Sequence, residues 1–327
     1  MRVGVIGFCE FDVLDYLASI FIGGGALSTS IHLACWDVDV FFSTYLGTDF
    51  PKRIVYKNIE PVSRHFVLLD APKTCSVVRI SIRREPIGHT CSIVEAGGWD
   101  QADPIDFIDI VKEVKTIYLK LPFALASQFS QSLPENVNLA MNPQGEYRLE
   151  QLADLRADLF FFNEKEICAA ARKSLPKLLP TISKISRDIV ITLGSKGALL
   201  YSHSESMYYY VPSLNVGIVD TLGCGDAFAG GLISSREKGE DICTQLATGT
   251  LSAAFNTQTY GALPDPTIYS CDTIEILHSL VPHILTFEKF GPLIERIKSG
   301  TCSRIIPSNK FLRFLEDTRR DMWKYSE

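Results

Sequence analysis

Short apolar runs that suit buried β-strands alternate along the chain with segments of helical periodicity. Helical patterns lie at 103–114, 163–173, 225–236 and 241–256, and the first opens with an aspartate followed by a proline. Strands that alternate with helices form a mostly parallel sheet, which needs helices over both faces. The alternation therefore predicts a three-layer α/β/α sandwich. The predicted strands are Val3–Gly7, Val38–Thr44, Thr116–Leu121, Val137–Met141, Asp158–Phe162, Asp188–Leu193 and Ala198–Tyr201.

One stretch departs from this alternation of strands and helices. The runs Cys75–Ser81 and Cys91–Ala96 are β-like and are joined by the charged turn 82–89, which contains Pro86 and Gly88. Two such runs around a turn predict a hairpin. Because no helix pattern lies beside it, we expect a small β lid that stands off the main sheet.

Composition limits the class of protein. The 327 residues are 46% hydrophobic and carry a net charge of −6 without a long basic run, so nothing indicates a nucleic-acid partner or an anionic membrane surface. No apolar stretch approaches the roughly 20 residues of a membrane-spanning helix. The nine cysteines are scattered without a CxxC pair, which is typical of reduced thiols. The chain also begins with a predicted strand rather than a signal segment, and these features predict a cytoplasmic protein.

The most informative segment is the glycine-rich run 219–231, VDTLGCGDAFAGG, at the start of a predicted helix. Backbone N–H groups at such a turn, together with the helix dipole, favour a phosphate group. Side chains at Gly223 and Gly225 would block close approach of phosphate oxygens. Asp226 lies in the first helical turn, where it could accept a proton from an attacking hydroxyl group or simply cap the helix.

This segment resembles the DTxGxGD signature of the ribokinase-like, or PfkB, family of carbohydrate kinases from Asp220 to Asp226. Further family elements follow the same order. Asn163–Glu166 resembles the NxxE motif, 191–198 resembles the strand and nucleotide-binding turn, and 256–264 resembles the loop that closes the nucleotide site. The resemblance covers about residues 1–264 and implies a ribokinase-like fold.

The resemblance also implies roles for individual residues. Asp226 would be the catalytic base, and Gly223, Cys224 and Gly225 would form an anion hole for the transferring phosphoryl group. Glu166 would hold Mg²⁺ through water with Asn163 nearby, although the same pair could form a helix capping box. ATP would contact Asn163, Thr192, Gly194 and Gly197, and Asp220 would contribute to a potassium site.

The acceptor side resembles the family more loosely. Gly23, Gly24 and Ser28 correspond to the paired-glycine element, although the family usually has asparagine at the position of Ser28 and glycine at that of Asp37. Asp12 is the expected ligand of acceptor hydroxyl groups because a carboxylate accepts two hydrogen bonds from neighbouring hydroxyls, and Asp15 is its rival. These departures affect the identity of the acceptor more than phosphoryl transfer itself. Residues that could border the same cleft are Asn142–Gly145, Arg148, Arg79, Arg83 and His89.

Together these features predict an ATP-dependent kinase that transfers the γ-phosphate of MgATP to a hydroxyl group of a small sugar or sugar derivative. The alternatives are a nucleoside kinase of the same family and a catalytically impaired regulatory protein that binds nucleotide or sugar. We expect a single domain over 1–327, with lid segments at about 8–22 and 72–98 and a helical part at 271–327 packed on the domain. Apolar alternation in Val77–Ile82 is compatible with a homodimer formed through the lid.

Overall fold

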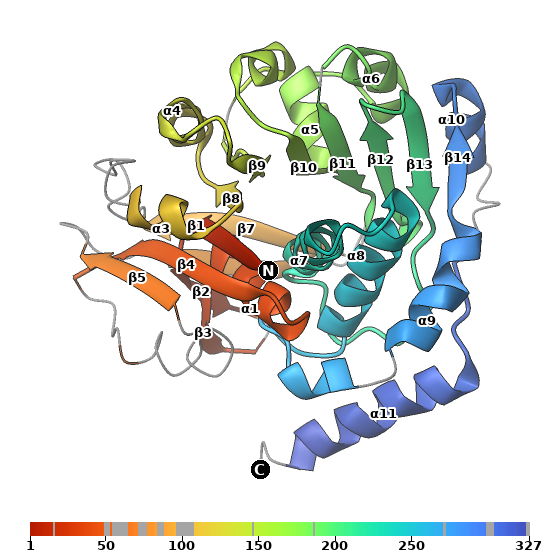
Figure 1. Cartoon of the computed structure of the whole chain (residues 1–327). Coiled ribbons are helices and arrows are strands. Elements are labelled where there is room, and N and C mark those ends of the chain that lie inside the picture. Colours follow the sequence, from red (N-terminus) through yellow and green to blue (C-terminus); the bar gives the residue numbers. More distant parts are fainter. Residues whose placement is uncertain are drawn as a thin grey trace.

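A ten-stranded sheet forms the centre of the molecule (Figure 1), with the strand order β14-β13-β12-β11-β10-β9-β8-β1-β4-β5. The computed structural model describes residues 1–15, 17–48, 53, 65–70, 77–83, 88–95, 108–145, 147–185, 187–270, 273–298 and 304–324. The strands are β1 (Arg2–Gly7), β4 (Asp39–Leu46), β5 (His65–Asp70), β8 (Thr116–Lys120), β9 (Asn138–Met141), β10 (Leu159–Asn163), β11 (Asp188–Thr192), β12 (Ala198–Ser202), β13 (Met207–Val211) and β14 (Leu285–Phe287).

The strands from β11 to β5 run parallel, whereas β12, β13 and β14 each pair antiparallel with their neighbour. Near the middle, β1 buries Val3, Val5 and Ile6 completely. Consecutive side chains of a strand point to opposite faces, so burial of both faces requires a layer on each side. The predicted mostly parallel sheet is confirmed, and the antiparallel strands β13 and β14 extend it beyond the predicted strands.

Two helix layers cover the sheet. One contains α1 (Gly25–Cys35), α7 (Cys224–Glu237) and α8 (Ile242–Asn256), whose apolar side chains join those of one sheet face in a single cluster. The other contains α3 (Ile108–Glu113), α4 (Phe123–Ser132), α5 (Glu164–Ala171), α6 (Leu175–Ile182) and α10 (Phe290–Lys298). These layers complete the predicted α/β/α sandwich and leave the ends of the parallel strands to carry polar groups.

A second, four-stranded sheet has the order β3-β2-β6-β7 and contains the hairpin expected from sequence. Its strands are β2 (Glu10–Leu14), β3 (Ser19–Gly23), β6 (Val77–Arg83) and β7 (Gly88–Glu95). Leu14 is fully buried and packs with Phe21 and Leu222. This small sheet therefore contacts the glycine-rich loop that precedes α7. The side chains of Arg79, Arg83 and His89 lie outside the described residues.

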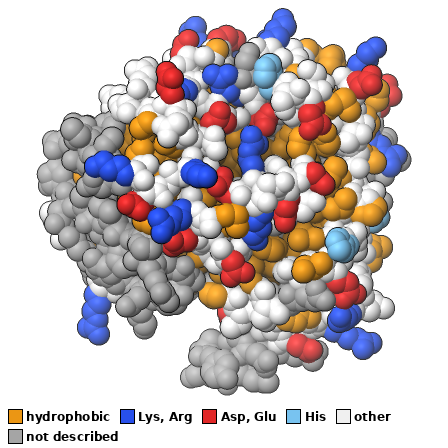
Figure 2. Space-filling model, viewed as in Figure 1, with side chains coloured by type: hydrophobic (Ala, Val, Ile, Leu, Met, Phe, Trp, Pro, Cys, Tyr) orange, Lys and Arg blue, Asp and Glu red, His pale blue; other side chains and the backbone are white. Residues whose placement is uncertain are grey.

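The C-terminal part contributes helices and the strand β14. Helices α9 (Thr273–Leu280) and α11 (Asn309–Lys324) contribute to a cluster of buried apolar side chains that also includes Phe255 of α8. A buried Trp36 stacks on Phe255 in the same cluster. Figure 2 shows acidic and basic side chains interspersed over the described part of the visible surface. Among the described residues, no helix is long and apolar enough to cross a membrane.

Candidate functional site

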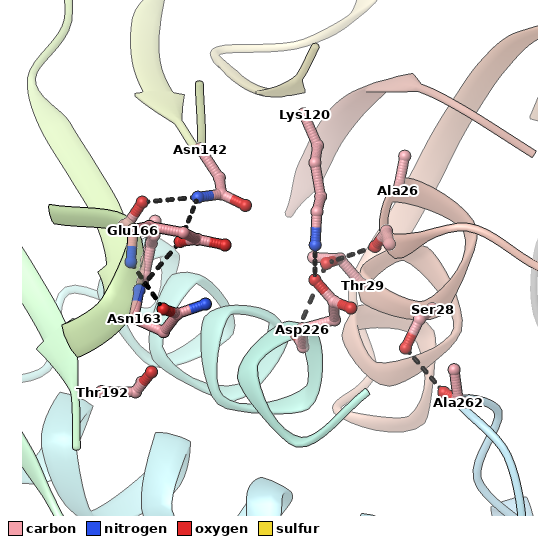
Figure 3. Close-up of polar contacts among 12 residues, drawn as sticks. Ala26, Ser28, Thr29, Lys120, Asn142, Asn163, Glu166, Thr192, Asp226 and Ala262 are labelled. Carbon is pink, nitrogen blue, oxygen red and sulfur yellow. Dashed lines mark hydrogen bonds and ion pairs between the residues drawn. The ribbon is translucent and has the colours of Figure 1, made fainter. Parts of the chain in front are cut away.

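Polar residues meet where the parallel strands end. Gly7, Lys120 and Asn163 are the last residues of β1, β8 and β10, and Asn142 follows β9 directly. The carboxyl ends of parallel strands lie at one edge of the sheet, which is the usual ligand-binding edge of an α/β fold. Figure 3 shows Lys120 pointing toward Asp226 in the first turn of α7, whereas Asn142 and Asn163 lie together beside Glu166.

The glycine-rich loop forms a tight turn before α7. Gly223 is the N-cap residue with φ of 76°, and a Cβ atom there would lie 2.8 Å from the Ala262 backbone. A larger residue is therefore disfavoured by both backbone conformation and space. Among the described atoms, none lies within 4 Å of the Cβ position of Gly225. The first N–H groups of a helix lack intrahelical partners, so this end of α7 can receive an anion.

Asp220 organises the same loop. Its Oδ1 atom accepts hydrogen bonds from the N–H groups of Thr221 at 2.6 Å and Leu222 at 3.1 Å. Its Oδ2 atom accepts one from Gly261 N–H at 3.0 Å. The buried carboxylate thus ties the loop before α7 to the loop after α8. This role accounts for Asp220 without a bound cation.

Asn256 supports this loop from α8. Its Nδ2 atom donates to the Leu222 carbonyl at 2.5 Å, and its Oδ1 atom accepts a hydrogen bond from His32 Nε2–H at 3.1 Å. Burial lowers the pKa of His32 to about 3, so the imidazole is neutral. Burial also raises the pKa of the Cys224 thiol to about 12, with Asp220 and Asp226 acting in the same direction against the Asn256 hydrogen bond. The thiol is therefore neutral as well, and Cys224 can serve the anion site only through its backbone.

Asp226 forms an ion pair with Lys120, which the sequence analysis did not single out (Figure 3). The two side chains are only 15% and 12% exposed. Burial opposes the charge of Lys120, but the Asp226 carboxylate, together with Tyr118 and Glu166, outweighs this effect, so the pKa of Lys120 is raised. Gly25 makes room for this pair, because a Cβ atom there would collide with the Lys120 ammonium group. The sequence signal was a lysine at the end of an otherwise buried strand.

Two further carboxyl groups lie near the ion pair. Burial raises the pKa of Glu10 to about 7, with Lys120 opposing and Asp226 reinforcing the shift. Burial likewise raises the pKa of Asp12 to about 8, with Glu10 and Asp226 adding to the shift and Lys120 opposing it. Asp12 belongs to the predicted acceptor residues, whereas Glu10 was missed. Alternation along β2 would have indicated it, because residues two apart share one face.

The remaining acceptor residues divide into two groups. Gly23 contacts the Asp12 carboxyl group so closely that a Cβ atom could not fit, and Gly24 adopts a φ of 100° against the Phe8 carbonyl. Ser28 instead donates its hydroxyl hydrogen to the Ala262 carbonyl at 2.7 Å and is fully buried (Figure 3). Asp15 is exposed, in contrast to Asp12. The Ser28 hydroxyl group is therefore engaged by the loop after α8, and Asp15 lies at the surface.

Asp37 occupies the position where the family usually has glycine. Its φ is 61°, a left-handed conformation that aspartate tolerates better than most residues. The departure from the family pattern therefore preserves the backbone of this turn.

Asn163 and Glu166 form the capping box considered in the sequence analysis. Asn163 Oδ1 accepts from Glu166 N–H, and Glu166 Oε2 accepts from Asn163 N–H, both at 2.9 Å. Asn142 donates to the Phe161 carbonyl at 2.7 Å and lies 3.5 Å from the same Oε2 atom. Within the described part of the chain, both hydrogen bonds that the Glu166 carboxylate accepts end on Oε2 and none on Oε1. Carboxylate and amide oxygens suit hydrated Mg²⁺, so this edge of the sheet fits the ion without a closed cage of protein ligands.

The expected nucleotide turn follows β11. Gly194 and Gly197 have φ values of 61° and 106°, and a Cβ atom at Gly197 would collide with the Val211 carbonyl. Thr192 donates to the Phe162 carbonyl at 3.4 Å. Lys196 forms an exposed ion pair with Glu164 at 3.1 Å. The two glycines fix the shape of the turn, and Lys196 contacts α5.

Known proteins share this fold and sequence pattern. The model of the pfkB family carbohydrate kinases matches residues 98–268. A 1-phosphofructokinase from Haloferax volcanii is 24% identical over 253 residues, which are 71% of this chain and 78% of that protein. A cytidine kinase from Thermococcus kodakarensis is 26% identical over 259 residues, covering 74% and 91%.

Solved structures agree in fold. A crystal structure of a probable sugar kinase from Rhizobium etli CFN 42 superposes with a TM-score of 0.72 at 18% identity, covering 84% of this chain and 98% of that one. The family match spans more than half of the chain and includes both the NxxE segment and the loop before α7. The chain therefore belongs to the PfkB family of carbohydrate kinases.

Proposed function

We propose that this chain transfers the γ-phosphate of MgATP to a hydroxyl group of a small sugar or sugar derivative, with Asp226 as the base. The observation that carries this proposal is the position of Asp226 in the first turn of α7, directly after the tight turn in which Gly223 is the N-cap residue. A base and an anion site within one helical turn can hold an attacking hydroxyl group and a phosphoryl group together.

The chemistry would proceed by direct displacement. The acceptor oxygen forms a bond to the γ-phosphorus atom while the bond to the bridging oxygen breaks, and ADP leaves with the electron pair. The hydroxyl proton passes to the Asp226 carboxylate. Lys120 orients this carboxylate through the buried ion pair. The N–H groups at the start of α7 stabilise charge on the transferring phosphoryl oxygens.

Mg²⁺ would supply charge neutralisation at the phosphate groups when bound. Glu166 would hold its water shell through Oε1, with Asn142 and Asn163 beside it, while Oε2 caps α5. The nucleotide would lie toward Thr192, Gly194 and Gly197 at the end of β11. One carboxylate can therefore serve both the metal and the helix.

Three finer expectations remain proposals. Potassium would act near Asp220, and replacing it in the assay buffer with a large organic cation tests this directly. A homodimer through the small sheet would be detected by analytical ultracentrifugation. The cytoplasmic location would be tested by fractionation of cells that produce the protein.

The direct test uses ADP release with a panel of sugars, amino sugars, sugar phosphates and nucleosides. Turnover of nucleosides alone would favour the second candidate, which the similarity to a cytidine kinase supports. Asp226→Asn should lower kcat by on the order of 10²-fold or more, since general-base catalysis contributes about 10²- to 10⁴-fold. Asp154→Asn, an exposed carboxylate, is the matched control. An Asp226→Asn enzyme as active as this control contradicts the assignment.

A further inference from the structure

One face of β2 looks toward the site with an unusual set of side chains. Glu10, Asp12 and Leu14 are two residues apart, so they share this face of the strand. Leu14 packs on Leu222 of the glycine-rich loop, which fixes the face over the start of α7. Glu10 and Asp12 therefore lie on the acceptor side of Asp226, and both interact electrostatically with it.

Neither carboxyl group has a protein partner among the described residues. No hydrogen bond or ion pair within the described part of the chain reaches Glu10 or Asp12, although Asp12 is only 4% exposed. Lys120 is engaged by Asp226 instead. A buried carboxylate without a donor is costly, so such a group is normally paired or hydrogen-bonded. These two carboxyl groups are thus placed to receive donors from a ligand.

The elements around Glu10 and Asp12 differ in the charges that they carry. The neighbouring strand β3 has the sequence SIFIG, which carries no charge. On the other side, Arg79 of β6 is in register with Val13, and its side chain is outside the described residues. The end of β8 contributes Lys120, and α7 contributes Asp226. With all groups ionised, the described cluster holds three carboxylates and one ammonium group.

We propose that the acceptor carries a basic nitrogen, whose ammonium group binds between Glu10 and Asp12 while one of its hydroxyl groups meets Asp226. The inference rests on the proposed function and names the substrate class of that site. An ammonium group offsets one of the two carboxylate charges that the Lys120–Asp226 pair leaves over and can donate to both groups, whereas neutral hydroxyl groups offset none. A phosphorylated acceptor would be repelled by the same carboxylates. Gly23 leaves space for the Asp12 carboxyl group, because a side chain at this position would collide with it.

An organic cation fits the geometry better than a metal ion does. Within the described residues, no three His, Cys, Asp or Glu groups converge closely enough to hold a metal ion. An ammonium group needs only hydrogen-bond acceptors on one side, and its carbon skeleton can extend toward Asp226. In this site, Glu10 and Asp12 of β2 select the acceptor by its charge, and Asp226 of α7 accepts the proton of its hydroxyl group.

The first experiment compares acceptors in matched sets. Glucosamine, galactosamine and 1-amino-1-deoxyfructose are each assayed beside the neutral parent sugar and its phosphate ester, with ADP release as the readout. We expect kcat/KM for the best amino compound to exceed that of its neutral parent by about tenfold or more, and the phosphate ester to be poorest. Higher efficiency with neutral or phosphorylated members overturns the inference and leaves the proposed kinase function intact. Failure to phosphorylate any acceptor of any charge counts against the proposed function itself.

The second experiment changes the charge. Glu10→Gln should reduce the ratio of kcat/KM for the amino compound to that for its neutral parent by about 10- to 100-fold, because a charge-assisted hydrogen bond is lost. Glu135→Gln, an exposed glutamate far along the chain, should leave this ratio unchanged. An unchanged ratio in a folded Glu10→Gln protein overturns the inference.

A third measurement needs no variant. Binding of an ammonium group should ionise Glu10 and Asp12 and release protons near pH 7, which calorimetry in buffers of different ionisation enthalpy detects without ATP. The best amino compound should release protons and its neutral parent should not. Equal release by both, or the same release on adding Mg²⁺ or K⁺ alone, contradicts an ammonium site.

Discussion

The Lys120–Asp226 ion pair should make a large and measurable contribution to stability. The two side chains are 12% and 15% exposed and in direct contact. Two unit charges 4 Å apart interact by about 4 kcal/mol at an effective dielectric constant near 20, and desolvation offsets part of this. We therefore expect a coupling free energy of about 2–4 kcal/mol between the two residues.

A double-mutant cycle isolates this coupling. The single variants Lys120→Met and Asp226→Asn and the double variant are unfolded in urea and followed by fluorescence and circular dichroism. The double variant should lose less stability than the sum of the losses of the two single variants. The reason is that each single variant leaves an unpaired polar group in the site, whereas the double variant removes both partners. Coincident transitions from the two probes are needed for two-state analysis.

The matched control is the pair Lys310–Glu275, which is separated by 2.9 Å but has side chains 76% and 59% exposed. Its cycle, with Lys310→Met and Glu275→Gln, should give a coupling of less than about 1 kcal/mol because exposed pairs are screened by water. A coupling at Lys120–Asp226 no larger than that of the control would refute the argument that burial strengthens the pair.

Three further predictions concern the same site. Gly25→Ala should disrupt the ion pair and reduce turnover by at least tenfold, whereas Gly291→Ala, with no described atom within 4 Å of its Cβ position, should be neutral in the same assay. Glu166→Gln should raise the Mg²⁺ concentration needed for half-maximal rate, and an unchanged requirement would contradict its metal role. Glu10 and Asp12 have raised pKa values of about 7 and 8, so the folded state binds their protons more tightly and loses this stability as pH rises from about 4 through 8. The free energy of unfolding should fall with pH by up to about 1.4 kcal/mol per pH unit for each group. Urea unfolding at a series of pH values measures this slope, and a Glu10→Gln/Asp12→Asn protein should lack it.

The glycine-rich loop before α7, proposed to bind phosphate, could be recognised from sequence because its features are local. Seven consecutive residues, Asp220–Asp226, carry the glycines, the helix start and the carboxylate, so no distant contact is needed to recognise them. The same holds for the capping box of Asn163 and Glu166, where the partners are three residues apart. The alternation of strands and helices likewise predicted the parallel sheet, since strand and helix periodicities are properties of short segments.

Ser28 and Asp37, which depart from the family sequence pattern, show what a local sequence pattern does not predict. Ser28 corresponds to an acceptor-side position in the family pattern, yet its hydroxyl group bonds to the Ala262 carbonyl, 234 residues away in the chain. Asp37 keeps the left-handed turn of the glycine that it replaces. Neither outcome depends on the identity of the residue alone, because each is decided by the backbone that surrounds it.

The sequence by itself determined the fold class and the reaction type, and it predicted the anion site that we propose at the start of α7. Only the tertiary structure decided the electrostatics of the acceptor side, where Lys120 from β8 and Glu10 from β2 meet Asp226 from α7. Residues 106 positions apart in the chain become an ion pair because β8 ends opposite the first turn of α7. Charge interactions depend on distance and burial, and neither quantity is encoded in any short stretch of residues.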